Sequence, residues 1–376
     1  MPSREAVLVR GARQLVTLRG PRCPRRGTAL GELGIIHDGA MLVRDGRIVA
    51  VGQGRRVENL ADARSAAEID ATGRVVLPGF VDSHTHLVPV DAEAMSSRAL
   101  ARQAEGRIRM FVRHGTTTLE AKAGQIKTLR VLARLDSFLI SLVPTYLGGL
   151  VHAAPGEELA EMIFAVARHR LARFADVNCG RHGLGVDDAR HALETARQAG
   201  LGLKVHAEQH SPSVGVRLAV ECGATSAANL EAAEEDDIAI LAESSTVATL
   251  LPGRTFYLGL DHHAPARALI DRGVAVALAT GFHPATSPTC SMQMVMSLAC
   301  TQLAMTPAEA IAAATINGAH ALGMADQTGS LEAGKLADFT LFDVSDYREI
   351  PCQFGVNLAV LTVKGGVVIY RQGETP

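Results

Sequence analysis

The chain has 376 residues, with 37 basic and 39 acidic side chains and a formal net charge of −2 at pH 7. A charge balance this close to neutral argues against a platform for nucleic acid or for an anionic membrane surface. The length allows a large core and fits one (β/α)8 barrel with a small accessory domain. We therefore expect chemistry on a small-molecule substrate.

Cysteine usage and the N-terminus bear on location. The six cysteines include no C-x-x-C pair, which is typical of reduced thiols and not of a disulfide scaffold. The first 20 residues have no apolar core followed by a cleavage site, and no apolar stretch is long enough to cross a bilayer. We expect a cytoplasmic protein without a nucleic-acid or membrane partner.

The N-terminal part alternates short strand-like runs with turn signals over residues 5–74. Residues 40–51 (AMLVRDGRIVAV) predict a hairpin whose turn is Asp45-Gly46. This part is predicted to be all-β.

The next segment, residues 75–87 (VVLPGFVDSHTHL), combines a β-branched run, a Pro-Gly turn and a second short strand. Successive side chains of a strand point to opposite faces, so His84 and His86 share a face. Barrel strands present catalytic groups at their C-terminal ends, where two imidazoles make half a metal site. The alternative is that both are inward-facing barrel side chains hydrogen-bonded to neighbours without metal.

Apolar β-rich runs then alternate with helical patterns, such as 157–174 and 186–199. Candidate strands are residues 80–84, 116–121, 140–145, 175–179, 202–206, 224–227, 246–251 and 274–280. Eight β-α repeats predict a parallel, closed sheet, and hence an α/β fold of the (β/α)8 TIM-barrel type over residues 75–329.

Beyond Gly329 the pattern returns to strands, over 337–343 and 359–370, with Gly365-Gly366 marking a hairpin. We expect residues 1–74 and 330–376 to form one small, discontinuous β-domain of β-sandwich type beside the barrel.

Several stretches occur in a familiar order: VRDGRIVAVG, LPGFVDSHTHLV, TTTLEAKAG, SSTVATLLPG, MTPAEAIAAATINGAHALG and GSLEAGKLADFTLFD. With these motifs the chain resembles the amidohydrolase superfamily. Within it the chain is most similar to imidazolonepropionases, which open the imidazolone ring in histidine breakdown. The resemblance covers nearly the whole chain and implies a metal-binding barrel flanked by a small β-domain, often in a homodimer.

The resemblance also implies a ligand set. His84 and His86 match the first two metal ligands of the family, and His206 matches the third. Zinc- or iron-type ions accept imidazole ligands and, in catalytic sites, keep a position open for water. The family's fourth ligand is an aspartate that also takes a proton from this water, and Gly281 stands in its place. We expect one divalent ion, zinc or iron, or none because this carboxylate is missing.

Further departures fall on other functional positions. Gln209 replaces a glutamate and Asn229 a histidine, and neither amide titrates near neutral pH. Gln125 stands where the family has a tyrosine, and Glu93 aligns near the arginine that holds the propionate carboxylate. We expect Gln209 and Asn229 to act in catalysis as neutral polar groups. Gln125, Glu93 and Gly281 are expected to line the substrate pocket.

Lys122 and His283 complete the predicted catalytic set. Glu120 and Lys122 share a strand face, where they form either a buried ion pair or a site with a catalytic lysine. His283 shares a face with Gly281 and could supply the missing base or ligand, the alternative being a solvated loop histidine.

Two further histidines, His262 and His263, precede a predicted helix over 264–272. They could contact substrate near the barrel mouth or serve in a helix-cap region. His210 and the arginines of 168–173 are expected on solvated surfaces.

Three functions are compatible with these residues. The one favoured by the sequence is a non-hydrolytic reaction, such as cyclisation, isomerisation or dehydration, on a small cyclic or heterocyclic biosynthetic intermediate. The lack of an obvious anion clamp suggests a substrate less charged than imidazolonepropionate. The alternatives are a C–N hydrolase with a three-histidine ion and a non-catalytic pseudoenzyme. Exchange of Glu for Gln and of His for Asn favours recruitment to a new reaction over decay.

Overall fold

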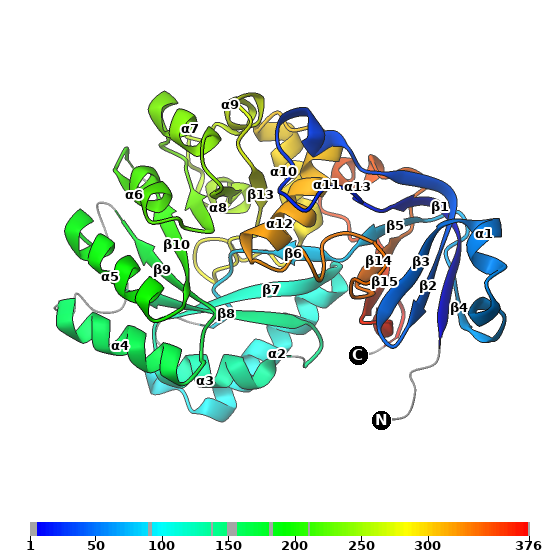
Figure 1. Ribbon diagram of the computed structural model, residues 1–376, viewed down its shortest axis with the longest axis horizontal. Helices are drawn as coiled ribbons and strands as arrows, with labels where there is room; N and C mark the ends of the chain where they lie inside the picture. The colour runs from blue at the N-terminus through cyan, green and yellow to red at the C-terminus, as the bar shows by residue number, and fades with distance from the viewer. Residues whose placement is uncertain are drawn as a thin grey trace.

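Two separate β-sheets organise the chain, which is seen here in a computed structural model (Figure 1). The structure describes residues 6–88, 92–136, 138–148, 156–179, 183–209 and 211–374, except for the side chain of Glu93. One sheet is an eight-stranded parallel barrel, and the other is a mixed sheet at the side of the molecule where both ends of the chain lie. The predicted fold class, a TIM barrel with a separate β-rich part, is confirmed.

The barrel strands follow one another in chain order, each parallel to the next. They are β6 (Phe80–Asp82), β7 (Thr116–Ala123), β8 (Ser141–Gly148), β9 (Phe174–Asn178), β10 (Gly202–Ala207), β11 (Ser226–Asn229), β12 (Val247–Leu250) and β13 (Val276–Leu278). The first and last strands meet where Thr85 forms a parallel bridge with Phe282. The C-terminal ends of all eight strands therefore surround one opening, the mouth of the barrel.

Helices connect the strands and cover the outside of the barrel (Figure 1). They are α2 (Ser97–Arg113), α3 (Ile126–Leu135), α4 (Gly156–Arg168), α5 (Val186–Gln198), α6 (Gly215–Glu221), α7 (Glu235–Ala242), α8 (Pro252–Leu258), α9 (Ala266–Asp271), α10 (Met292–Gln302), α11 (Pro307–Ala313), α12 (Ile316–Ala321) and α13 (Glu349–Cys352). Short 3-10 turns occur at η1 (Gly27–Gly31), η2 (Ala61–Ser65) and η3 (Ala92–Ala94).

Helix α2 illustrates how the sequence fixes these elements. The hydroxyl of Ser96 caps it by accepting the amide N–H of Ala99. Leu100, Ala104 and Ile108 recur every four residues and form its buried face. The helix therefore has one apolar side, which packs on the barrel.

The mixed sheet combines both ends of the chain. Its strands are β1 (Val7–Val16), β2 (Ile35–Arg44), β3 (Arg47–Gln53), β4 (Ala67–Asp70), β5 (Val75–Pro78), β14 (Phe339–Phe342), β15 (Ala359–Lys364) and β16 (Val367–Arg371), with helix α1 (Gly54–Glu58) beside them. Both predicted hairpins are present. The turn of β2–β3 is Asp45-Gly46 and that of β15–β16 is Gly365-Gly366, and all four residues have positive φ, as tight hairpin turns require.

Two of the predicted boundaries differ from the structure by more than the others. Residues 75–78, expected in the barrel, form β5, which lies between β1 and β14 of the mixed sheet. The Pro78-Gly79 turn separates the sheets, so the barrel begins at Phe80. The helix expected over 157–174 ends at Arg168, because Arg170 adopts a left-handed conformation and Phe174 starts β9.

Aromatic packing joins the two sheets. The rings of Phe80, at the start of the barrel, and Phe342, at the end of β14, lie 5.7 Å apart and are fully buried. Among the described residues, no helix has both the length and the apolar character needed to span a membrane.

Candidate metal centre and its pocket

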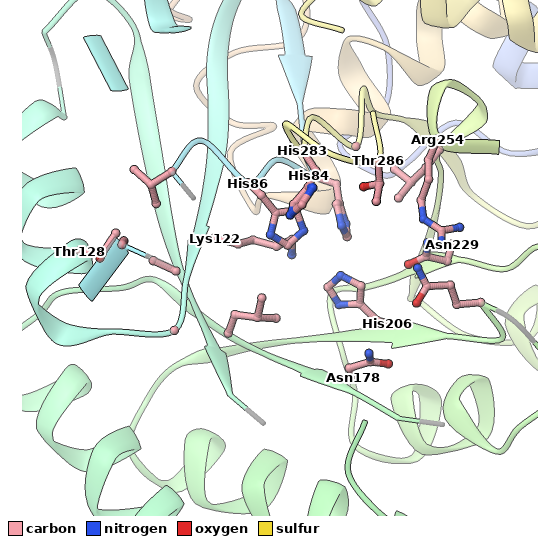
Figure 2. Close-up of a pocket in the computed structure, with 18 of the residues that line it drawn as sticks. His84, His86, Lys122, Thr128, Asn178, His206, Asn229, Arg254, His283 and Thr286 are labelled. Carbon is pink, nitrogen blue, oxygen red and sulfur yellow. The ribbon is translucent and has the colours of Figure 1, made fainter. Parts of the chain in front are cut away.

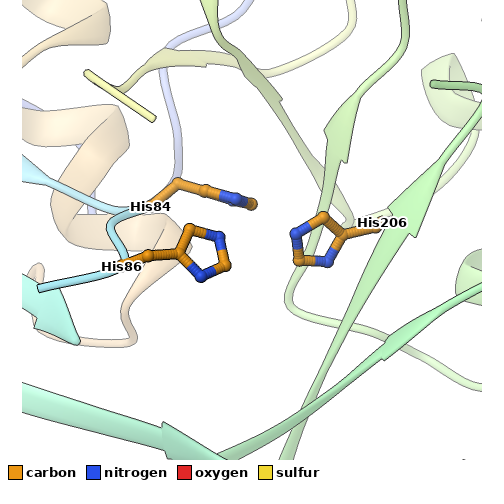
Figure 3. A group of neighbouring side chains, drawn as sticks. All are labelled: His84, His86 and His206. Carbon is orange, nitrogen blue, oxygen red and sulfur yellow. The ribbon is translucent and has the colours of Figure 1, made fainter. Parts of the chain in front are cut away.

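Three histidines converge at the mouth of the barrel (Figure 3). One ligand atom from each of His84, His86 and His206 lies within 4.8 Å of the other two. β6 ends at Asp82, two residues earlier than expected, but the bridge of Thr85 to Phe282 keeps the chain extended between the first two histidines. The predicted alternation therefore still brings them together with His206 of β10.

The protonation states of this three-histidine group suit metal binding. Burial, with smaller contributions from neighbouring positive groups, lowers the pKa of His84 and of His86 well below the usual histidine value. Nδ1 of His206 lies 3.0 Å from Oδ1 of Asp176, a carboxylate that can only accept, so Nδ1 carries a proton and Nε2 keeps its lone pair. Three imidazoles, of which His206 is oriented by Asp176, are a donor set that zinc- or iron-type ions accept.

Asp176 belongs to a buried ionic network behind the group. Lys122 forms ion pairs with Asp176 and with Glu120, and Nζ of Lys204 lies 2.7 Å from Glu120. All four side chains are at most 2% exposed. The predicted pairing of Glu120 with Lys122 is present, and Lys122 also lines the cavity described below.

The network shifts the pKa values of its lysines in opposite directions. Burial lowers the pKa of Lys122, but the carboxylates of Asp176 and Glu120 more than offset this and raise it overall. For Lys204, burial dominates over Glu120 and lowers the pKa to about 8. Asp176 and Lys204 were not singled out in the sequence, although a charged residue inside an otherwise apolar strand marks each of them.

The histidines open into a cavity of about 290 Å³ (Figure 2). Its polar lining consists of His84, His86, Lys122, Gln125, Thr128, Asn178, His206, Gln209, Asn229, Arg254, His283 and Thr286, and Gly281 also lines it. Every predicted catalytic residue, together with Gln125 and Gly281, therefore faces the same space as the histidine group. The catalytic and binding roles assigned to them stay predictions.

Two predicted substrate contacts lie elsewhere. His262 is exposed and His263 half-buried, and neither lines the cavity. Helix α8 follows β12 directly, so it stands between this strand and the two histidines in the chain, and their contact with substrate stays a prediction. The side chain of Glu93 and the whole of His210 lie outside the described residues, whereas Arg168, Arg170 and Arg173 are exposed as expected.

Arg254 is a lining residue that the sequence analysis missed. Its side chain is 9% exposed and its Nη1 lies 3.2 Å from Oε1 of Glu231. With the Gln209 amide turned to present its oxygen, that oxygen accepts from Nε and Nη2 at 3.2 and 2.9 Å. Two sequence features could have identified Arg254 as a lining residue. It directly follows the LLPG turn, and it lies in the first turn of a helix that follows a barrel strand.

The backbone is unusual where β10, β11 and β13 end. Glu208, Asn229 and Leu230 have φ values of 45°, 84° and 67°, and Gly281 has φ of 58°. Left-handed conformations cost energy in residues with a Cβ atom and cluster at functional sites. Here Asn229 and Gly281 line the cavity, and Glu208 and Leu230 are chain neighbours of lining residues, which supports this mouth as the functional site.

His283 lies against the histidine group. Its ring is 5.4 Å from that of His86, edge to face, and its Nδ1 accepts the amide N–H of Ala285 at 3.2 Å. Burial lowers its pKa below the usual histidine value. Its use as a base or as a further ligand stays a prediction.

Known proteins resemble this chain over most of its length. The model of the amidohydrolase family matches residues 75–369. The imidazolonepropionase of Geobacillus kaustophilus is 41% identical over 98% of this chain and 99% of its own, and that of Solibacter usitatus is 40% identical over 96% and 97%. In both, the similarity extends beyond the barrel into the mixed sheet.

Solved structures share the fold at low identity. Escherichia coli guanine deaminase superposes with a TM-score of 0.79 at 17% identity, covering 98% of this chain and all of its own. A zinc-bound atrazine chlorohydrolase variant from Arthrobacter aurescens gives 0.78 at 16% identity, covering 97% and 95%.

The family match spans well over half of the chain, and the relatives named above are enzymes. This supports an enzyme in preference to the non-catalytic pseudoenzyme. The chain belongs to the amidohydrolase family and, within it, is similar to the imidazolonepropionases.

Proposed function

We propose that this protein is a metal-dependent hydrolase that breaks a C–N bond in a small cyclic amide or related heterocycle. The observation that carries the proposal is the convergence of three imidazoles within 4.8 Å at a cavity of about 290 Å³. Such a volume suits a single small ring with short substituents. Similarity to imidazolonepropionases supports a hydrolase in preference to the non-hydrolytic reaction that the sequence favoured.

His84, His86 and His206 would hold the ion. A divalent ion with three histidine ligands supplies a bound water of lowered pKa and polarises a carbonyl group. Asp176 accepts a hydrogen bond from Nδ1 of His206, which leaves the lone pair on Nε2 available to the ion.

The other lining residues would bind and orient the substrate. Gln209 and Asn229 are neutral, so they can hold polar ring atoms but cannot take a proton near neutral pH. His283 is the imidazole next to the group and is our candidate for proton transfer.

A non-hydrolytic reaction is the second candidate, and one hydrogen bond favours it. Since Nδ1 of His283 accepts the N–H of Ala285, the neutral ring carries its proton on Nε2. In that tautomer the ring donates at Nε2 instead of accepting a proton there, which suits positioning better than general-base catalysis.

Two measurements test the proposal. Metal analysis of protein purified without chelators should find about one zinc or iron per chain. His84→Ala and His206→Ala should lose it, whereas the surface variant His191→Ala should keep it. A panel of cyclic ureides and lactams is then incubated in H₂¹⁸O and the products are analysed by mass spectrometry. Ring opening with uptake of one ¹⁸O atom is expected.

Protein that is free of transition metal would contradict the proposal. Turnover that gives a product without ¹⁸O would instead favour the second candidate.

A further inference from the structure

We infer that Lys204 is a positioning residue that fixes His84 relative to His206. The two histidines come from opposite sides of the barrel, and Lys204 connects these sides through the interior. The inference rests on the proposed function in taking the three histidines as metal ligands. It adds the residue that sets the geometry of the group.

The first observation is the topology of the barrel. β6 and β10 are the first and fifth of its eight strands, with β7, β8 and β9 between them in the hydrogen-bonded order. In a closed barrel these two strands face each other across the interior. The rings of His84 and His206 approach from these two sides, with their centroids 4.6 Å apart (Figure 3). Backbone hydrogen bonds run around the wall, so contacts across the interior are left to set this separation.

Lys204 makes such a contact. Its Nζ donates to the carbonyl oxygen of Ser83 at 3.0 Å, and Ser83 directly precedes His84. Along β10, Lys204 lies two residues before His206, and strand alternation places both on the same face. One side chain from the strand of the third ligand therefore holds the backbone next to the first ligand.

The ammonium group of Lys204 is itself held in place. Oε1 of Glu120, on β7, accepts from Nζ at 2.7 Å. The same oxygen accepts the hydroxyl hydrogen of Thr145, on β8, at 2.7 Å. The centroid of the Phe174 ring, at the start of β9, lies 5.3 Å from Nζ. With only 2% of its side chain exposed, Lys204 has little freedom to move.

Gly202 makes room for this arrangement. A Cβ atom at this position would lie 2.5 Å from two atoms of the Phe174 ring, which is closer than van der Waals contact permits. A larger residue at Gly202 would therefore displace the ring that packs near the ammonium group of Lys204. The sequence Gly-Leu-Lys-Val-His of β10 thus combines the space, the positioning group and the ligand on one strand.

The energetic cost of the buried network also favours a role in positioning. The network places four charged side chains inside the barrel, those of Lys122, Lys204, Glu120 and Asp176. Branched apolar residues usually fill the interior of such barrels, and buried ion pairs often stabilise a protein no more than apolar residues of similar volume. The network reaches His206 through Asp176. It reaches the segment of His84 through Lys204.

Zinc binding by Lys204→Met tests the inference, because electrostatics and positioning predict opposite signs. Removal of a positive charge near the site would by itself tighten the binding of a divalent cation. Loss of the contact to Ser83 would instead release His84 and weaken binding. We expect the Kd for zinc to rise roughly 10- to 100-fold. It is measured at pH 7 on the metal-stripped full chain, by competition with a chromogenic chelator.

A spectroscopic measurement separates positioning from a general loss of stability. The visible absorption of bound cobalt(II) depends on the number and arrangement of its ligands. We expect the cobalt(II) spectrum of Lys204→Met to differ from that of wild type. Thr145→Val is the matched control, because it removes the other hydrogen bond to the same oxygen of Glu120. This control should keep the wild-type spectrum and the wild-type Kd for zinc.

A double variant guards against misfolding. Lys204→Met leaves the carboxylate of Glu120 with one cation fewer, whereas Lys204→Met/Glu120→Gln removes both members of the pair and keeps the net charge of the network. The double variant should show the same weakening of zinc binding and the same kind of spectral change. Thermal melting verifies that each variant is folded, and the double variant decides if the single one is not.

Zinc binding that is unchanged or tighter in the folded Lys204 variants would overturn the inference, as would a weakening that Thr145→Val reproduces. These titrations need no turnover, so they are independent of the hydrolysis test. Ring opening by wild type together with unchanged metal binding in the variants would contradict the inference alone. Weakened metal binding in the variants without ring opening by wild type would contradict the hydrolase alone. Wild type that binds neither zinc nor cobalt would contradict both.

Discussion

At the scale of single residues, Asp176 controls which nitrogen of His206 is available. Its carboxylate accepts the Nδ1 proton and also pairs with Lys122, so one buried side chain serves both the histidine group and the network behind it. Burial opposes ionisation of Asp176, but His206 and Lys122 outweigh it and hold its pKa below the usual value. Asp176 is therefore an anion near neutral pH and can only accept.

We predict that Asp176→Asn weakens metal binding roughly 10- to 100-fold, because the amide no longer enforces the tautomer of His206. Competition with a chromogenic chelator gives the affinity. Asp188→Asn, an exposed change on α5, is the control. Unchanged affinity in Asp176→Asn would show that His206 does not depend on this contact.

Gly281 allows a gain-of-ligand experiment. The three atoms nearest to a Cβ atom added there belong to the side chain of Leu251, at 3.4 to 3.6 Å, which is ordinary contact. Its φ of 58° is left-handed, a region that Asp and Asn enter more readily than other residues with a Cβ atom.

We therefore expect Gly281→Asp to fold with a stability loss of about 1 kcal/mol and to hold a divalent ion more tightly than wild type. Gly281→Asn has the same shape without the charge, so it should lose the same stability and gain no affinity. Equal metal affinity in the two variants would contradict a ligand position next to Gly281. Urea unfolding and chelator competition provide the two measurements.

At the scale of elements, one loop fastens the C-terminal strands to β1. Asp346, between β14 and α13, accepts from Nε2 of Gln14 at 3.1 Å, and the amide of Tyr347 donates to Oε1 of Gln14 at 2.8 Å. The guanidinium of Arg348 donates twice to Asp346 at 2.8 Å, and its backbone amide donates once more at 2.9 Å. Hydrogen bonds from Arg348 and Gln14 lower the pKa of Asp346 in the folded state.

A carboxyl group whose pKa is lower in the folded than in the unfolded state stabilises the fold above the unfolded value, here 3.8, and this stabilisation disappears as the pH falls through the folded value. We predict that Asp346→Asn unfolds at a lower temperature than wild type at pH 7 and that the difference shrinks below pH 4. Melting curves between pH 3 and 7 measure it, with the exposed Asp343→Asn as control. A difference in melting temperature that does not change with pH would show that the charge of Asp346 is not the source of the stabilisation.

The elements also explain which side-chain positions could be predicted from the sequence. Strand alternation is local, so it correctly placed His84 beside His86, and the order of β-α repeats placed His206 at the same mouth. Arg254 and the His262-His263 pair depended on where helix α8 starts and which way it leads the chain, and no short-range pattern gives that direction. Strand alternation does not give the direction of Glu208 toward α6, because its left-handed conformation breaks the pattern there, and Gln209 was placed in the site by the family resemblance alone.

At the scale of the whole molecule, the barrel and the mixed sheet share buried aromatic packing. Phe342 is completely buried and contacts Phe80 of the first barrel strand. Removing such a ring typically costs about 3–5 kcal/mol.

We predict that Phe342→Ala loses about this amount in urea unfolding and that both parts still unfold in one transition. Phe354→Ala, at a position that is 56% exposed, should lose less than about 0.5 kcal/mol. Two separate transitions in Phe342→Ala would show that the barrel and the sheet are stable independently.

The position of β5 has a consequence for synthesis of the chain. This strand leads into the segment that carries His84 and His86, and one of its two neighbours is β14, which the ribosome adds about 260 residues later. At 5–20 residues per second, the apolar edge of β5 waits roughly 13 to 50 s for its neighbour. During that interval the nascent chain exposes an unpaired sheet edge at which a chaperone can bind.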